Sequence, residues 1–164
     1  MKQIAIFAVA LAAAWGVAAG VAQTPGENPF PAAKVAGAFV TAQTVTAPGS
    51  SLGAGVVSNR FSRGSKVVFR VFAGDVTTGR VLTGADVKYL YVQIPGQPNL
   101  KLTYGGPFKA TDPVARLPWT GTWTIPADYP LGTVVFKVLL KTNSHGYGSF
   151  VQMPVVSAML TVTE

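Results

Sequence analysis

Much of the chain consists of short stretches in which hydrophobic and polar residues alternate, which is the pattern of half-buried β-strands. In one stretch Val67, Phe69 and Val71 fall on one face of an extended strand, while Lys66 and Arg70 fall on the other. Clusters of Gly and Pro separate these stretches at the spacing of an all-β sandwich of about seven strands. We expect the strands at 35–46, 66–72, 87–94, 100–104, 119–125, 133–142 and 155–163.

The segment WTGTWTI holds two of the three tryptophans of the chain and three threonines. Trp119, Trp123 and Ile125 fall on one face of a strand, and the threonines fall on the other. Threonine suits a solvated strand face, whereas large apolar side chains suit the core between two sheets. The pattern therefore places both indoles in the core and not in a ligand cleft.

The following segment, IPADYPLG, ends that strand with two prolines and a glycine. Tyr129 stands in it where a corner tyrosine would, with a hydroxyl able to bond to the backbone. In the next strand, apolar residues alternate with lysines. The inward set is expected to be Val134, Phe136, Val138 and Leu140, and the outward set Lys137 and Lys141.

The N-terminus has the layout of a secretory signal peptide. Met1 and Lys2 precede the uncharged stretch IAIFAVALAAAWGVAAGVA, and its small final residues predict cleavage after Ala22. A membrane span is the alternative, since about 20 apolar residues cross a bilayer, but the alanine- and glycine-rich composition favours cleavage. We expect a signal peptide at 1–22, a tether at 23–33 and one domain at 34–164. The mature protein would be periplasmic or secreted, without a membrane span.

The residue inventory restricts the chemistry of the chain. It has no cysteine and one histidine, so neither a disulfide nor a histidine pair for acid–base catalysis can form. Gly-x-Ser-x-Gly and phosphate-loop motifs are missing as well. The six acidic residues fall mostly in different expected loops, so no carboxylate pair is indicated. We expect no enzyme activity, no catalytic residues and no cofactor.

The chain is basic. Removal of Lys2 lowers the 13 Lys and Arg residues to 12, against 6 Asp and Glu, and leaves a formal charge of +6. Such a balance favours acidic partners. Outside the inner membrane these are anionic lipids, lipopolysaccharide, acidic glycans or acidic proteins before nucleic acid. Solubility alone is the plainer explanation of the charge.

Four cations are concentrated in the segment NRFSRGSKVVFR, which makes it a candidate patch for an anionic partner. Lys66 and Arg70 share the outer face of one strand, and Arg60 and Arg63 precede it. A solvated face, or an edge strand protected against aggregation, accounts for the same residues. We favour that simpler interpretation.

The segment DVKYLYVQI is partly apolar on both faces of its expected strand. Tyr89 and Tyr91 share one face with Val87, and the other face is aliphatic. The tyrosines are candidates for stacking on a sugar or for anchoring a protein interface. Core packing is the favoured alternative, because buried strands often lose their alternation.

The only histidine lies in NSHGYG, which predicts a hairpin tip between the last two strands. His145, Met153 and Met159 together offer the soft ligands that Cu(I) prefers. An exposed polar turn and gap-filling methionines are the simpler interpretation. Met159 is expected to point outward, since Leu160 and Val162 suit the inward set. We therefore expect no metal site, with copper as the alternative.

RGSKVVFRVFAGDVTTGRVLTGADVKYLYVQIPG and TWTIPADYPLGTVVFKVLLKT resemble bacterial exported immunoglobulin-like domains, in which similar turn and corner motifs mark successive strands. The resemblance covers Phe61 to about Thr163, and its motifs are framework motifs. The cysteine pair of antibody domains is missing. The resemblance implies an immunoglobulin-like antiparallel β-sandwich that acts as a non-catalytic binding or assembly module for another cell-envelope component. The alternative is a small-ligand carrier, of copper through His145 or of a glycan through Tyr89 and Tyr91.

Overall fold

The computed structural model describes residues 37–105, 117–151 and 159–164, and the structural statements below refer to these residues. The expected signal peptide at 1–22, the tether at 23–33 and Met153 lie outside them. The described chain forms eleven strands and no helix. They are β1 (Ala38–Thr46), β2 (Arg60–Ser62), β3 (Lys66–Asp75), β4 (Val87–Gln93), β5 (Leu100–Lys101), β6 (Thr103–Tyr104), β7 (Trp119–Thr124), β8 (Gly132–Val134), β9 (Lys137–Thr142), β10 (Tyr147–Val151) and β11 (Leu160–Thr163).

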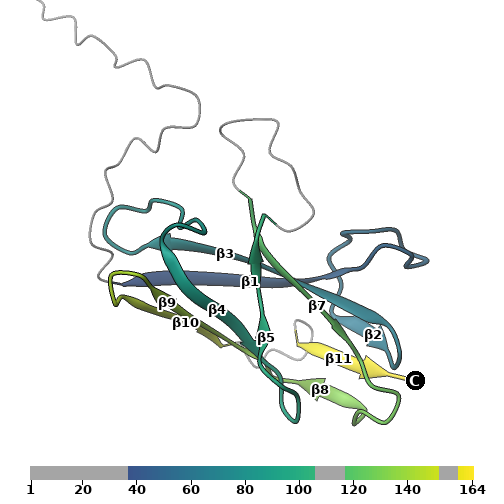
Figure 1. The fold of residues 1–164 in the computed structure, drawn as a ribbon. Helices are drawn as coiled ribbons and strands as arrows, with labels where there is room; N and C mark the ends of the chain where they lie inside the picture. Colours follow the sequence, from purple (N-terminus) through teal and green to yellow (C-terminus); the bar gives the residue numbers. More distant parts are fainter. Residues whose placement is uncertain (1–36, 106–116, 152–158) are drawn as a thin grey trace, which may run out of the picture.

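The strands form two four-stranded sheets, with the orders β1-β3-β7-β6 and β10-β9-β4-β5. All neighbours within these two sheets are antiparallel. A third sheet, β2-β11-β8, contains one parallel pair, β2 with β11. Figure 1 shows this small sheet at the end of the molecule where the C-terminus lies. The architecture is all-β and consistent with a β-sandwich.

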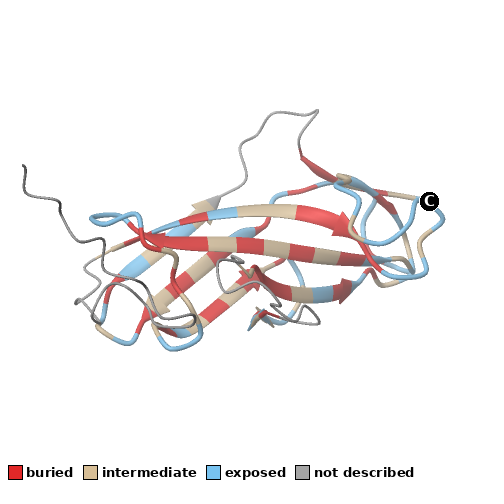
Figure 2. Cartoon of the chain, turned by 90° about the horizontal axis from the view of Figure 1, so that it is seen from above, coloured by how far each residue is buried: buried red, intermediate tan, exposed pale blue. Residues whose placement is uncertain are grey.

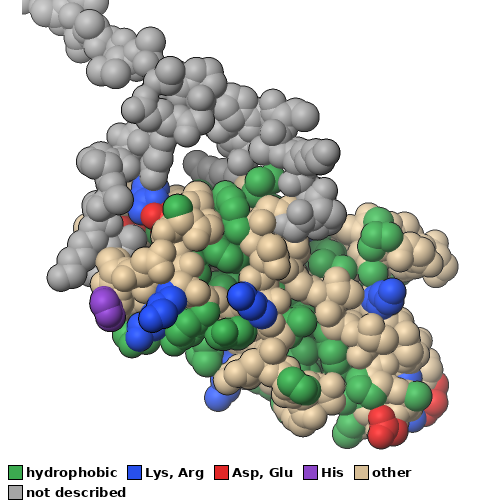
Figure 3. Space-filling view, in the orientation of Figure 1, with side chains coloured by type: hydrophobic (Ala, Val, Ile, Leu, Met, Phe, Trp, Pro, Cys, Tyr) green, Lys and Arg blue, Asp and Glu red, His purple; other side chains and the backbone are tan. Residues whose placement is uncertain are grey.

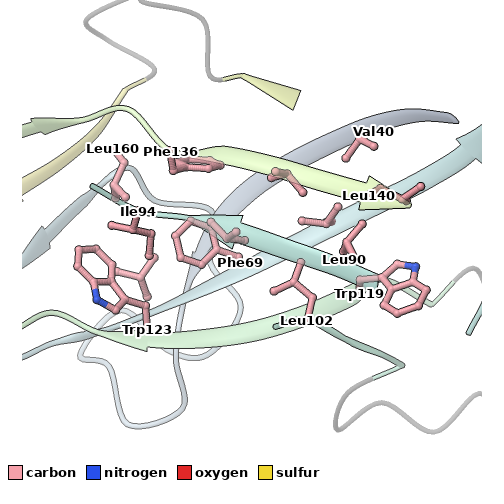
Figure 4. Close-up of a cluster of buried hydrophobic side chains, with 14 of the residues drawn as sticks. Val40, Phe69, Leu90, Ile94, Leu102, Trp119, Trp123, Phe136, Leu140 and Leu160 are labelled. Carbon is pink, nitrogen blue, oxygen red and sulfur yellow. The ribbon is translucent and has the colours of Figure 1, made fainter. Parts of the chain in front are cut away.

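The core forms where the inner faces of the two large sheets meet. Phe69 from β3 lies edge-on to Phe136, with ring centroids 5.0 Å apart, and both side chains are buried. Figure 4 shows Trp119 and Trp123 at opposite ends of this cluster, with Phe69 between them. Figure 2 shows the alternation of buried and more exposed residues along the strands that the sequence predicts. The expected place of both indoles in the core is confirmed.

Two expected strands are each divided between sheets. The stretch 133–142 pairs first with β11, as β8, and then with β4 and β10, as β9. The stretch 100–104 pairs with β4 as β5 and with β7 as β6, and the buried Leu102 lies between the two. An alternating pattern records which side chains are buried but not which strand is the neighbour. The predicted inward positions of 133–142 are nevertheless all buried: Val134, Phe136, Val138 and Leu140.

The corner after β7 is fixed by hydrogen bonds from two residues. The Tyr129 hydroxyl donates to the Pro95 carbonyl oxygen at 2.9 Å, which confirms the expected bond to the backbone. Its ring lies edge-on to Trp123, with centroids 5.0 Å apart. Arg63 Nε donates to the Tyr129 carbonyl oxygen at 2.7 Å, so the β2–β3 turn is fastened to the same corner.

A buried ion pair holds the loop between β3 and β4. Arg80 Nη1 and Nη2 donate to the two carboxylate oxygens of Asp86 at 3.0 and 2.9 Å, and the Thr83 amide and hydroxyl donate to the same carboxylate. Burial of Asp86 opposes its ionisation, but the hydrogen bonds from Arg80 and Thr83 outweigh this and lower its pKa. These hydrogen bonds therefore fix the conformation of the loop immediately before β4.

The edges of the two large sheets meet where β1 approaches β10. Gly37 and Tyr147 form a parallel bridge there. A Cβ atom on Gly148 would lie 2.5 Å from the Ala38 carbonyl oxygen, which is closer than real Cβ contacts. The close approach of the two backbones therefore requires glycine at this position. It also fixes the start of β10, where Tyr147 lies.

Candidate functional site

The outer face of the sheet β10-β9-β4-β5 carries the tyrosines that the sequence singles out. Leu90 and Val92 of β4 are buried in the core, so Tyr89 and Tyr91 point to the opposite side, where they are half-buried. The favoured expectation that these tyrosines pack in the core is wrong. Val87 does not share their face, because an irregularity in the β4–β9 pairing between Val87 and Tyr89 leaves Val87 buried.

The strand register places lysines directly opposite these tyrosines. Tyr89 on β4 faces Lys141 on β9, and Lys141 in turn faces Tyr147 on β10. Tyr91 faces Lys101 on β5. Lys137 lies on the same outer face of β9, opposite Gln93. We name this surface the tyrosine–lysine face, and its members are Tyr89, Tyr91, Lys101, Lys137, Lys141 and Tyr147.

The side chains of this face also contact one another. The rings of Tyr89 and Tyr91 are stacked, with centroids 5.2 Å apart and planes inclined by 30°. Lys141 Nζ lies 5.0 Å from the centroid of the Tyr147 ring. A hydrogen bond to the Tyr147 phenol raises the pKa of Lys141 above its ordinary value. Tyr147 itself is 61% exposed.

None of the four acidic residues in the described part of the chain lies on this face. Asp75 ends β3 and accepts a hydrogen bond from the Thr77 amide, and Asp86 is paired with Arg80. Asp128 lies in the corner after β7, and Glu164 follows β11. Figure 3 shows Lys and Arg side chains beside hydrophobic ones where Figure 1 draws β4 and β9, with the acidic side chains in view toward the two ends. The described part of the face is therefore uniformly positive.

The structure does not bring the predicted basic cluster to this surface. Lys66 and Arg70 lie on the outer face of the other large sheet, since Val67, Phe69 and Val71 point into the core.

The two arginines that precede β3 lie at the small sheet and its corner. Arg60 lies on β2, paired with Thr161 of β11. Arg63 donates to the corner backbone and lies 3.8 Å from a Glu164 carboxylate oxygen, so its guanidinium holds two parts of the fold together. The two surfaces that the sequence suggested thus lie on opposite sides of the sandwich.

His145 lies in the exposed turn between β9 and β10, which confirms the expected hairpin. The second strand of the hairpin is β10, and not the strand expected at 155–163. Its φ is +69°, a left-handed conformation. The expectation that Met159 points outward is wrong: it is 7% exposed and joins the buried residues. Met159 precedes Leu160, which pairs with Val134, so about 25 Å of extended chain separates it from the turn. The two residues are not brought together.

Among the described residues, a hollow of about 420 Å³ lies beside the corner tyrosine. Its lining includes Pro95, Pro126, Tyr129 and Leu131, together with Asp128 as an acidic group. The Tyr129 hydroxyl is already bonded to the Pro95 carbonyl oxygen. Within the described ranges, no three His, Asp or Glu side chains gather as metal ligands would. The remaining polar side chains in the lining of the hollow are Gln97 and Thr133.

The sequence did not reveal Tyr147 or Lys101 as members of the tyrosine–lysine face. It placed Lys137 and Lys141 on an outer face, but without the strand order they could not be set beside the tyrosines. The signal for Tyr147 was the short run YGSFV after a glycine, which is easily taken for part of the turn.

The chain matches no family model, no curated protein and no solved structure. In the described part of the chain, no helix is long and apolar enough to cross a membrane. What the fold and the surface define is an all-β protein with antiparallel sheets and one face of tyrosine and lysine.

Proposed function

We propose that this protein is a non-catalytic binding module that is exported and interacts with another component of the cell envelope through the tyrosine–lysine face. The observation that carries this proposal is the register of β5, β4, β9 and β10. It sets three tyrosines and three lysines on one surface, with no carboxylate among the described residues of that surface. Surface tyrosines beside lysines support this role, because the rings supply contact area and the cations select anionic partners.

The same proposal includes an immunoglobulin-like type for the sandwich. In such domains one sheet has the order A-B-E-D and the other contains G-F-C. Taken in chain order, β1-β3-β7-β6 follows the first pattern and β10-β9-β4 the second, with β5 as an added edge strand. Tyr129 stands at the corner between the strands that correspond to E and F, where these domains carry a corner tyrosine.

A binding role fits the chemistry of the face better than a catalytic one. Catalysis needs a nucleophile, a base and a stabilising group that converge on one point. Here the polar groups are phenols and ammonium groups spread over an open sheet surface. The contact with Tyr147 raises the pKa of Lys141 above its ordinary value, which is the opposite of the lowered pKa that a lysine general base needs.

The role is tested by capture from the native envelope with the full chain as bait. We compare the wild-type protein with K137E/K141E on the tyrosine–lysine face and with K66E/R70E on the opposite face. The proposal predicts that an envelope component is retained by the wild type and by K66E/R70E and is lost with K137E/K141E. Loss with K66E/R70E alone would assign binding to the other side of the molecule and reject the proposal.

Export has its own test. Expression of the full chain in a bacterium followed by fractionation should place the protein outside the cytoplasm, with a mature N-terminus at Gln23 by mass spectrometry. An intact N-terminus on a cytoplasmic product would contradict it.

A further inference from the structure

We propose that the ligand of the tyrosine–lysine face is an acidic polysaccharide, a glycan chain whose sugar rings carry carboxylates. This inference rests on the proposed function and names the ligand class of the same surface. The observation behind it is the strand register, which places a lysine directly opposite each of the three tyrosines on a neighbouring strand. The pairs are Tyr89 with Lys141, Tyr147 with Lys141 and Tyr91 with Lys101.

A uronic acid repeats the same two elements, a ring and a carboxylate. The faces of its ring present C–H groups, which suit the negative face of an aromatic ring. When a sugar stacks on Tyr89 or Tyr91, the neighbouring strand that carries the paired lysine lies about 4.8 Å to the side, so the long lysine side chain can extend toward the carboxylate. The phenol hydroxyls and lysines can also hydrogen-bond the sugar hydroxyls.

The layout of the face suits a polymer. Tyr89 and Tyr91 are two residues apart on β4, about 6.6 Å along the strand, and Tyr147 lies two strands from Tyr89, about 9.6 Å across the sheet. The aromatic positions therefore spread over a surface wider than one sugar. The hollow beside Tyr129 lies at the corner after β7, and its lining includes no member of the tyrosine–lysine face. An extended chain can use several tyrosine–lysine pairs at once.

The cations of the face argue against an acidic protein as the partner. All three are lysines, and lysine is depleted at the centre of protein interfaces, where arginine is enriched. The arginines of the described chain lie elsewhere: Arg60 is on β2, Arg63 is fastened to a corner, Arg70 is on the opposite sheet and Arg80 is paired with Asp86.

The test measures binding of the purified full chain to polygalacturonate by isothermal titration, with neutral dextran and poly-L-glutamate as comparison polymers. Four variants divide the contributions. Y89A/Y91A removes the stacking surface, Y89F/Y91F restores the rings without hydroxyls, K137E/K141E reverses the charge, and K66E/R70E reverses charge on the opposite sheet. Unfolding temperature and near-UV circular dichroism verify that each variant is folded.

We expect polygalacturonate to bind and dextran not to bind. Y89A/Y91A and K137E/K141E should each weaken binding by about tenfold or more, which corresponds to about 1.4 kcal/mol. Y89F/Y91F should retain most of the affinity, and K66E/R70E should change it less than about threefold.

Two results would overturn the inference. Equal binding of poly-L-glutamate, insensitive to Y89A/Y91A, would show that charge alone is recognised and that the partner is an acidic protein. Absence of polygalacturonate binding would exclude the ligand class. In either case the envelope capture separates the two proposals: if capture still depends on Lys137 and Lys141, the binding module stands and only its ligand class fails.

Discussion

The two large sheets present outer faces of very different composition. On β10-β9-β4-β5 the outward residues include three tyrosines and three lysines, set opposite one another across the strands. On β1-β3-β7-β6 the outward residues include Lys66 and Arg70, the threonines Thr122 and Thr124, and Phe39, which is 46% exposed; no tyrosine of the described chain lies on that face.

The difference separates two uses of positive charge. Cations among threonines suit solubility or protection of the sheet. Cations set opposite several tyrosines, as on the tyrosine–lysine face, offer both ring surface and charge, which suits recognition of a ligand. The cluster of basic residues in the sequence indicates the outer face of β1-β3-β7-β6, whereas the strand pairing indicates the tyrosine–lysine face.

The largest loss of stability is expected from a substitution in the core between the two large sheets. Phe69→Ala removes a fully buried ring that packs on Phe136 and should lower the free energy of unfolding by about 3–5 kcal/mol. Because the core supports both sheets, the substitution should lower the amide-exchange protection of β3 and β9 alike. Urea denaturation and hydrogen exchange measure this. Loss of protection in one sheet alone would show that the sheets are not one cooperative unit.

A substitution at the junction of the sheets should affect the tyrosine–lysine face selectively. Gly148→Val places a side chain against the Ala38 carbonyl oxygen, and we expect a loss of about 1–3 kcal/mol in unfolding free energy. Ligand binding should weaken as well, because β10 carries Tyr147. Ser149→Val, at the exposed neighbouring position, is the matched control and should change stability by less than about 0.5 kcal/mol. Equal stability of the two variants would contradict the tight junction.

The loop before β4 should make the molecule sensitive to acid. The pKa of Asp86 lies below its usual 3.8, so its stabilisation is complete above the unfolded pKa and is lost as the pH falls through the lower folded value. D86N should lower stability at neutral pH by about 1–3 kcal/mol and flatten the loss of stability below about pH 4. Thermal unfolding across the acid range measures both effects. An unchanged acid dependence would show that other carboxyl groups control it.

The smallest effect is expected from salt, which should change the affinity for polygalacturonate and not the stability of the fold. Raising the ionic strength from about 0.1 M to about 1 M shortens the Debye length from about 10 Å to about 3 Å. Binding of polygalacturonate should weaken but persist, because stacking on the tyrosines is insensitive to salt. Complete loss of affinity for the wild type would reduce the face to a charge patch and remove its distinction from the opposite sheet.

The sequence predicted the parts of this fold that depend on alternation. Trp119, Trp123 and Tyr129 take their expected places because burial follows directly from the hydrophobic pattern and from the proline-bounded corner. β2 was missed because it has three residues, and β10 because YGSFV has no strict alternation. The Arg80–Asp86 pair was missed because a buried ion pair in a loop resembles ordinary surface charge in a sequence.

The candidate site was less accessible to sequence reasoning. Tyr89 and Tyr91 were identified, but core packing was preferred, because a strand that is apolar on both faces is typical of a buried strand. The irregularity between Val87 and Tyr89, which places Val87 on the buried side, leaves no mark in the sequence. The lysines opposite the tyrosines come from other strands, and only the sheet order brings them together. Cross-strand register is a property of the whole fold, and it determines the composition of this surface.

The most direct measurement of the central claim is an amide chemical-shift map of the ¹⁵N-labelled protein during titration with polygalacturonate. The account predicts shifts concentrated on β4, β9 and β10 around Tyr89, Tyr91 and Tyr147, with β1, β3 and β7 unchanged. Shifts centred on Lys66 and Arg70, with Tyr89 and Tyr147 unaffected, would contradict it.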